Sequence, residues 1–303
     1  MQFAAWPSYE RPWDEVLTLA RWAESVGFGG FWAADHFLQF GAADDDRGDG
    51  EVQECWTVLT AVGAAVPRLR LVSMVSPVTF HHPVVLTKRA VTADHVSGGR
   101  VVLGVGAGWQ VNEHLAYGVE LPPPGPRVDR FGEALQVIHG MLREDRFSFG
   151  GSYFQVDDVA CRPKPVGALP ILVGSKGPRM ARLTARWADE WNTWGDPTQL
   201  AERSALVDRA CESAGRDPAT LTRSAQAVIV LLDDEADRAA AEAKAMPGQT
   251  LIGTAGHLVE LLQQYVAMGV HEFAVPDFNL GRTGAERLEQ YQRLHAEVLV
   301  HVG

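Results

Sequence analysis

The chain has few of the features that mark secreted, metal-binding or membrane proteins. Its 303 residues include only three cysteines, which are far apart and form no CxxC pair, so neither a disulfide framework nor a zinc site is indicated. The longest apolar stretch, residues 227–232, is far too short to span a bilayer. The N-terminus lacks the basic segment and long apolar run of a signal peptide, and we expect a cytoplasmic protein without a metal site.

Positive charge is also in short supply. The 27 lysines and arginines are outnumbered by 38 acidic residues, which gives a formal net charge of −11 spread along the chain. This balance argues against nucleic-acid and membrane partners, because both carry negative charge. A small-molecule partner remains compatible, since local basic groups and a helix N-terminus can hold even an anion. The acidic run Asp44–Glu51 resembles a calcium loop, but Arg47 occupies a ligand position, so we interpret it as a solvated loop placed to act as a lid.

Short β-branched runs alternate with longer amphipathic segments along most of the chain. The predicted strands are residues 1–5, 30–34, 69–75, 100–105, 170–173, 189–194, 225–232 and 270–275. Helical stretches separate most of these strands, a pattern that favours parallel pairing through right-handed crossovers. Eight such units close a barrel. We therefore predict an α/β fold, a (β/α)8 TIM barrel that forms a single domain over residues 1–303, with an open doubly wound sheet as the rival.

Two segments interrupt this alternation. Residues 121–126 read Leu-Pro-Pro-Pro-Gly-Pro, which predicts an extended connection because proline cannot continue a helix or a central strand. Residues 147–156 contain Gly150-Gly151 between two short strand-like runs. They predict a small β-hairpin inserted before the fifth strand of the barrel.

Ligands of such barrels bind at the carboxyl ends of the strands, and polar residues stand at several of these positions. Asp35-His36 follows the second predicted strand, where a histidine suits proton transfer and the carboxylate can bond a ligand or orient the ring. A purely structural histidine is an equally open alternative. The hydroxyls of Ser76 and Thr79 follow the third strand and either bond a heterocycle edge or cap the turn.

The ends of the fourth and fifth strands are rich in glycine. Gly104, Gly106 and Gly108 alternate before Trp109, which suits close approach to a flat ligand that Trp109 would flank. A dinucleotide fingerprint would need glycine at position 109 and a long helix after it. Residues 174–179 read Gly-Ser-Lys-Gly-Pro-Arg before a predicted helix, which indicates an anion site or an ordinary turn, while the P-loop pattern is absent.

Nine tryptophans are many for a chain of this length. Trp32, Trp56, Trp109 and Trp194 all fall near the ends of predicted strands. They favour an aromatic cavity for a flat ring system, although packing in the core explains them equally well.

Together these residues resemble the luciferase-like monooxygenase superfamily, and within it the coenzyme F420-dependent oxidoreductases. The resemblance covers nearly the whole chain. The segments that carry it are residues 34–37, 54–57, 71–75, 82–83, 94–100, 103–109, Glu113, 170–174 and 188–192. Its most specific part is Ser97-Gly98-Gly99-Arg100 followed by the glycine series that ends at Trp109.

The resemblance implies a TIM-type barrel, usually a homodimer, with a deazaflavin ring deep in the barrel mouth. It implies that His36 is the catalytic proton donor or acceptor and that a non-prolyl cis peptide joins Met74 and Val75. The residues expected to contact the cofactor are Asp35, His36, Met74, Val75, Ser76, Gly106, Ala107, Gly108, Trp109, Asn112, Gly174, Ser175, Lys176, Gly177 and Arg179. Among these, the last four hold the phosphate, in agreement with the anion site inferred from the sequence.

Two departures from the family pattern bear on the substrate. The similar F420-dependent glucose-6-phosphate dehydrogenases carry glutamate where this chain has Trp109, which argues against a sugar phosphate and favours an apolar or aromatic substrate. Ser175-Lys176 also adds bulk and charge to a loop that is usually Gly-Gly-x-Gly. We expect hydride transfer between F420 and a small organic substrate, with a separate F420 or flavin reductase renewing the reduced cofactor. The alternatives are a two-component FMN-dependent monooxygenase and a non-catalytic flavin-binding barrel.

Overall fold

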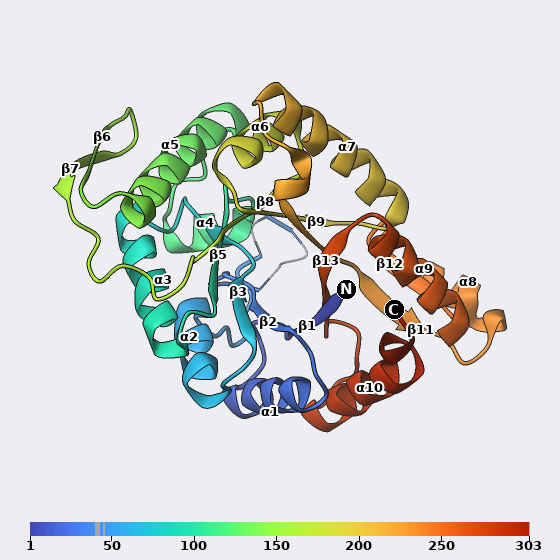
Figure 1. The fold of residues 1–303 in the computed structure, drawn as a ribbon. Coiled ribbons are helices and arrows are strands. Elements are labelled where there is room, and N and C mark those ends of the chain that lie inside the picture. Colours follow the sequence, from blue (N-terminus) through green and yellow to red (C-terminus); the bar gives the residue numbers. More distant parts are fainter. Residues whose placement is uncertain (40–42, 45, 303) are drawn as a thin grey trace.

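Eight parallel strands close into a barrel in the computed structural model, which describes residues 1–39, 43–44 and 46–302 (Figure 1). The barrel strands are β1 (Gln2–Trp6), β2 (Gly30–Ala33), β3 (Arg70–Ser73), β5 (Val101–Gly106), β8 (Ile171–Gly174), β9 (Glu190–Trp194), β10 (Thr222–Gln226) and β13 (Val270–Pro276). Each strand pairs in parallel with the next, β13 pairs with β1, and the additional β3–β5 pairing completes the ring. The predicted (β/α)8 barrel is therefore confirmed, and the open sheet is excluded.

Helices surround the barrel on its outer side (Figure 1). The longer ones are α1 (Trp13–Ser25), α2 (Cys55–Ala65), α3 (Pro83–Ser97), α5 (Pro124–Arg143), α6 (Pro178–Trp187), α7 (Pro197–Ser213), α9 (Ala255–Ala267) and α10 (Gly284–Glu297). The short helices are α4 (Val111–Tyr117) and α8 (Arg238–Glu242). Local signals set the ends of α3: His82 caps its first turn, Pro83 occupies the first helical position, and Gly98 ends it at φ 72°. Across the described ranges, no helix has both the length and the apolar character needed to cross a membrane.

Helix α5 corrects one expectation. It begins at Pro124, inside the segment predicted to be extended. Pro124 and Pro126 both fall in the first turn, where backbone N–H groups have no partner within the helix, so the missing donors cost little there. The predicted hairpin is confirmed as the antiparallel pair β6 (Phe147–Gly150) and β7 (Gln155–Val159).

The seventh predicted strand, residues 225–232, is two strands rather than one. The barrel strand β10 ends at Gln226, and β11 (Val228–Leu231) leaves the barrel to pair in parallel with β12 (Thr250–Gly253). The sequence analysis did not predict β12. A continuous apolar run gives no sign of which partner each half takes, because both halves are buried.

Side chains alternate between the barrel interior and the helical layer. Along β1, Phe3 and Ala5 pack outward with the helices, while Ala4 and Trp6 belong to a separate cluster inside the barrel. Polar groups fill the other end of the barrel, where Arg70 pairs with both Glu190 and Glu272. These groups stand at or near the starts of their strands, opposite the end at which barrel enzymes bind ligands.

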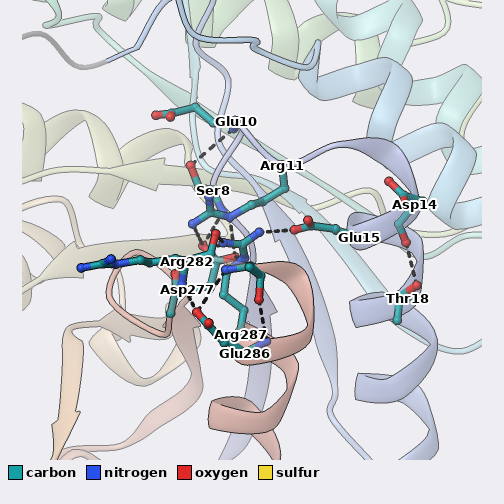
Figure 2. Close-up of polar contacts among 12 residues, drawn as sticks. Ser8, Glu10, Arg11, Asp14, Glu15, Thr18, Asp277, Arg282, Glu286 and Arg287 are labelled. Carbon is teal, nitrogen blue, oxygen red and sulfur yellow. Dashed lines mark hydrogen bonds and ion pairs between the residues drawn. The ribbon is translucent and has the colours of Figure 1, made fainter.

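The loops that follow the first and last strands are joined by Asp277 (Figure 2). Its Oδ1 accepts the Ser8 backbone N–H at 2.8 Å, and its Oδ2 accepts Nε–H of Arg11 at 3.1 Å. Arg287 of α10 pairs with Glu15 of α1 and lies 3.9 Å from Asp277 Oδ2. We call these five residues the seam clasp. A cavity of about 320 Å³ lies beside it, between α1 and α10.

Candidate active site

The segment after β3 is the point at which the predicted site residues meet. A non-prolyl cis peptide joins Met74 and Val75, as the family resemblance implied. The side chain of Val75 lies against the ends of β5 and β8, since a Cβ on Gly106 or Gly174 would fall 2.7 or 3.3 Å from its methyl groups. The next residue, Ser76, donates its hydroxyl to Asp35 Oδ2 at 2.5 Å. Segments from β2, β3, β5 and β8 therefore converge on one place at the barrel mouth.

The alternating glycines of β5 have a packing role within the protein. A Cβ on Gly104 would lie 1.8 Å from the Ser73 carbonyl oxygen, which no rearrangement of a side chain could relieve. Gly108 has φ +91°, and its Cβ position lies 2.5 Å from the Thr79 hydroxyl. The glycines allow the chain from Ser73 to Thr79 to run close against β5. Protein contacts thus account for a series that the sequence analysis interpreted as a surface for a ligand.

Asp35 is a buried carboxylate with one oxygen still available. Its Oδ2 accepts the Ser76 hydroxyl and lies 2.9 Å from His81 Nε2. Ser76 in turn accepts the Trp56 indole N–H at 3.0 Å, which fixes its orientation. Asp35 Oδ1 has no hydrogen-bond partner among the described residues, although it is fully buried. Buried acceptors are rarely left unpaired, and this oxygen is able to accept a hydrogen bond from a further group at the mouth.

His36 is oriented by a second buried carboxylate, that of Glu113. His36 Nδ1 lies 3.0 Å from Glu113 Oε1, and Glu113 Oε2 accepts the Phe37 backbone N–H at 3.0 Å. The His36 ring also contacts the rings of Tyr9 and Trp109, at centroid distances of 5.3 and 5.6 Å. With Nδ1–H donated to the carboxylate, Nε2 is the nitrogen left to exchange a proton.

Glu113 contacts His36 but is absent from the residues predicted to contact the cofactor. The segment that contains it was not predicted to be a helix. In the structure it forms α4, which turns the Glu113 side chain back to His36. In the sequence, the only indication that Glu113 belongs to the site was its place among the residues that carry the family resemblance.

The residues around α4 form the rim of the mouth. Asn112 is buried, and its Nδ2 donates to the carbonyl oxygens of Gln39 and Asp46, so it holds the acidic loop. Asp45 and residues 41–42 lie outside the described residues. Ala107 is half-buried against the outer core. Trp109 is 57% exposed, next to His36, where it can cover one edge of the site.

The loop before α6 combines an inward serine with positive charge. The Ser175 hydroxyl accepts the Trp191 indole N–H at 2.9 Å and is buried, so it faces the protein interior. Gly177 precedes the first turn of α6, which has no side-chain cap, and the space beside Gly177 is open. Burial, and then the neighbouring Arg203, lower the pKa of Lys176 from its ordinary value. The open helix start and the surplus positive charge suit an anion.

Arg179, one turn further along, has an exposed partner. It donates to Asp129 Oδ1 of α5 at 2.5 Å. Both side chains are about half exposed, so this pair is weak and can be exchanged for an anionic ligand.

The opposite half of the mouth is aromatic. Trp6 at the end of β1 lies 5.3 Å from Trp194 at the end of β9 and 5.2 Å from Phe278, just after β13 (centroid distances). We call these three side chains the aromatic box. Of the tryptophans expected near the mouth, Trp194 belongs to the box and Trp109 to the rim. Trp32 lies deeper, where it donates to Glu272.

A closed parallel barrel with an oriented histidine, an unpaired buried carboxylate oxygen and a helix start suited to an anion at its strand ends has the arrangement of a TIM-barrel enzyme. Comparison with known proteins gives the family. The family model described as luciferase-like monooxygenase matches residues 1–250, and the chain belongs to this family.

Curated relatives of the chain include F420-dependent enzymes. The chain is 30% identical over 230 residues to the F420-dependent hydroxymycolic acid dehydrogenase of Mycobacterium tuberculosis, a match that covers 76% of this chain and 62% of that protein. It is 33% identical over 181 residues to the F420-dependent glucose-6-phosphate dehydrogenase of Nakamurella multipartita, covering 59% and 52% of the two chains. The chain thus spans between half and two thirds of the length of these two relatives.

Solved structures show the same fold over the full length. An F420-dependent secondary alcohol dehydrogenase, in complex with an F420–acetone adduct, superposes with a TM-score of 0.82 at 19% identity, covering 100% of this chain and 99% of that one. The coenzyme F420-dependent tetrahydromethanopterin reductase of Methanopyrus kandleri gives a TM-score of 0.80 at 17% identity, with the same coverage.

Proposed function

We propose that the protein is an F420-dependent oxidoreductase that exchanges a hydride between the deazaflavin and a small, apolar organic substrate. The observation that carries the proposal is the pairing of His36 with Glu113 beside the unpaired oxygen of Asp35, all at the barrel mouth. The names of the relatives at 30% and 33% identity support F420 as the cofactor.

The residues present fit this cofactor. Asp35 Oδ1 can accept an N–H from the pyrimidine edge of the ring system. Val75, packed on Gly106 and Gly174, offers an apolar surface to one ring face. The start of α6, with Lys176 nearby, offers donors and positive charge to the phosphate of the tail. The remaining predicted contacts are His36, Met74, Ser76, Ala107, Gly108, Trp109, Asn112, Ser175, Gly177 and Arg179.

The chemistry that F420 supplies when bound is two-electron hydride exchange at a ring carbon. The chain's own residues handle the accompanying proton. Glu113 accepts Nδ1–H and fixes the His36 ring, and His36 Nε2 gives or takes the proton at the substrate atom. Tyr9 and Trp109 pack against the histidine and restrict the access of water to it.

We also propose that residues 1–303 form one domain and that the enzyme is a homodimer. A separate F420 or flavin reductase would renew the reduced cofactor. Trp109, an apolar side chain where similar sugar-phosphate dehydrogenases have glutamate, supports a substrate without a sugar phosphate.

Titration of the purified protein with F420 and with FMN, followed by the fluorescence of each ring system, tests the cofactor. We expect saturable binding of F420 at micromolar concentrations and much weaker binding of FMN. Tight FMN binding with no F420 binding would instead favour the two-component monooxygenase. Incubation of the F420-loaded protein with a panel of activated alkenes, imines and ketones, read at the cofactor's absorbance, then tests hydride exchange.

A further inference from the structure

We infer that the indole N–H of Trp6 is a substrate-recognition group, and that the aromatic box binds a flat, uncharged molecule through one oxygen acceptor such as a ketone carbonyl. The inference rests on the proposed function, because it assigns the substrate side of the same mouth. Of the three box residues, only Trp194 was expected near the mouth from the sequence.

Trp6 has a buried donor without a partner. Its side chain is 4% exposed, and its Nε1 makes no hydrogen bond to any of the described residues. An unpaired buried N–H costs about 1–3 kcal/mol, so a protein rarely keeps one without a use. A ligand acceptor at this point would pair the donor and recover that cost.

The direction of the Trp6 side chain follows from β1. Ala4 and Trp6 face the barrel interior, and Trp6 is the last residue of the strand, so its ring lies at the mouth. Its backbone is fixed as well, because the Asp277 backbone N–H donates to the Trp6 carbonyl oxygen at 3.1 Å. The seam clasp holds Asp277 in turn (Figure 2). The donor is therefore held in place before any substrate arrives.

The box lies on the half of the barrel that the cofactor residues leave open. Asp35, Val75, Gly106 and Gly174 follow or end the consecutive strands β2, β3, β5 and β8. Trp6, Trp194 and Phe278 belong to β1, to β9 and to the loop after β13, across the ring. Val75 and Trp194 both pack on the same inner cluster, so the two halves adjoin. A substrate in the box would lie between the cofactor half and the aromatic wall.

His36 stands at the boundary of the two halves. It follows β2, and its ring contacts Tyr9, which follows β1 and packs on the same inner cluster. A molecule held by Trp6 would therefore have the proton-exchanging histidine within reach of its edge.

The surroundings of the donor select the kind of acceptor. The three rings of the box are uncharged, so an ionised carboxylate would lose its hydration there without gaining a cation. The polar side chains of the neighbouring strands β9 and β10 are already paired with one another. Asn192 Nδ2 donates to Ser224 Oγ at 3.0 Å and to Gln226 Oε1 at 2.7 Å. A neutral acceptor attached to a flat apolar frame meets both conditions.

The test compares two probes of the same shape on two variants. 2-Acetylnaphthalene carries a carbonyl and 2-ethylnaphthalene does not, and binding of each to the protein, with and without added F420, is followed by tryptophan fluorescence. Trp6→Phe removes the N–H and keeps an aromatic ring, while Trp194→Phe is the matched control within the box. We expect Trp6→Phe to weaken binding of the ketone by about three- to tenfold, the range of one neutral hydrogen bond, and to leave the hydrocarbon within about twofold. Trp194→Phe should affect both probes alike.

Two results would overturn the inference. One is equal affinity of the wild type for ketone and hydrocarbon, which needs no variant. The other is a Trp6→Phe protein that keeps the preference for the ketone. Binding of F420 is measured separately by its own fluorescence. A chain that binds F420 but shows no Trp6-dependent preference refutes this inference alone, and one that shows the preference but binds no F420 refutes the cofactor proposal alone.

Discussion

His36 can act as a proton carrier because a buried glutamate determines how its ring is held. Because His36 Nδ1 contacts Glu113 at 3.0 Å, Nε2 is the ring nitrogen left free. The Phe37 backbone N–H donates to the same carboxylate, which holds the Glu113 side chain beside His36. Asp35 and His36 could be identified as site candidates from the sequence, since both follow a predicted strand. Their partners could not be predicted, because the contact of Asp35 with Ser76 joins residues 41 positions apart and that of His36 with Glu113 joins residues 77 positions apart.

Glu113→Gln should separate positioning from catalysis. A glutamine oxygen can still accept Nδ1–H, but its amide nitrogen cannot accept the Phe37 N–H, so the ring is held less firmly. We expect kcat to fall by about tenfold, and by about 100- to 10,000-fold in His36→Ala, which lacks the proton carrier altogether. Cofactor affinity, measured by F420 fluorescence, should change little in Glu113→Gln.

Glu113→Asp is the control for that experiment, since it restores the charge at a shorter reach. Partial recovery of kcat relative to a Glu113→Leu variant would indicate that the carboxylate acts through His36. An unchanged kcat in His36→Ala would contradict the assignment of the proton to this residue.

Strand β5 and the segment after β3 behave as one packed unit. The glycines at 104, 106 and 108 were identified from the sequence, and their spacing was interpreted as a place for a ligand. The structure gives them a nearer partner, the chain from Ser73 to Thr79. Similarly, Arg100 of the family motif donates to the carbonyl oxygens of Ser97, Leu69 and Gly63, so the motif ties helices to the barrel rather than serving the mouth.

A double-mutant cycle tests this packing. Gly106→Ala would place a Cβ 2.7 Å from Val75 Cγ2, at the end of a side chain that can be shortened. We expect Gly106→Ala to lower stability by about 1–3 kcal/mol, the usual cost of overpacking, and to weaken F420 binding. Adding Val75→Ala should recover at least half of the lost stability, measured by urea denaturation.

Gly104→Ala is the contrasting variant, because its Cβ would meet the Ser73 backbone and no truncation can make room. Additive effects of Gly106→Ala and Val75→Ala would show that the two residues do not share this space.

The loop before α6 gives a pH-dependent prediction. Burial and Arg203 lower the pKa of Lys176 below its ordinary value of 10.5, and a bound phosphate would raise it again. A group whose pKa rises on binding takes up a proton, so affinity is greatest where free Lys176 is protonated and falls as the pH rises through its lowered pKa. We therefore expect F420 to bind more weakly as the pH rises through the lowered pKa of Lys176.

Lys176→Gln should remove this dependence and weaken binding at neutral pH. A deazaflavin that lacks the phosphate tail is the matched ligand, and its affinity should depend on neither the pH in this range nor the substitution. The same slope in Lys176→Gln and in the wild type would place the titrating group elsewhere.

For the whole molecule, alternation of strands and helices was enough to predict the barrel. The predicted strands overlap all eight barrel strands, most of which are short apolar runs bounded by turns. The seventh overlaps β10 only at residues 225–226, because β10 is polar and the apolar run of this segment forms β11. The pairing of β11 with β12 outside the barrel was not predicted, because no glycine or proline marks the point near Ala227 at which β10 ends and β11 begins. The mouth was located by the rule for parallel barrels, yet its division into a cofactor half and an aromatic half depends on which strands adjoin, and only the closed ring defines that.

The seam clasp adds side-chain contacts beside the junction of the first and last strands, β1 and β13, which pair directly. Asp277 is buried with Arg11 and Arg287, whose side chains are 19% and 8% exposed. Asp277→Leu leaves the largely buried Arg11 without its ion-pair partner, while Arg287 keeps Glu15, so the variant should lower the free energy of unfolding by about 3 kcal/mol. The exposed pair of Arg293 with Asp233 is the control, and Asp233→Ala should cost at most about 1 kcal/mol.

The pH dependence of stability gives the clasp a second test. Burial raises the pKa of Asp277 above its ordinary value of 3.8, and Arg11 only partly opposes this. The folded protein therefore holds this proton more tightly than the unfolded chain, so the stability linked to this proton is greatest below pH 3.8 and is lost as the pH rises through the folded-state pKa. Asp277→Asn cannot titrate, so the stability of the wild type relative to this variant should decrease from pH 4 towards neutrality, as measured by urea denaturation at each pH. A difference that increases over this range would mean that the arginines outweigh burial, and that the clasp is held mainly by charge.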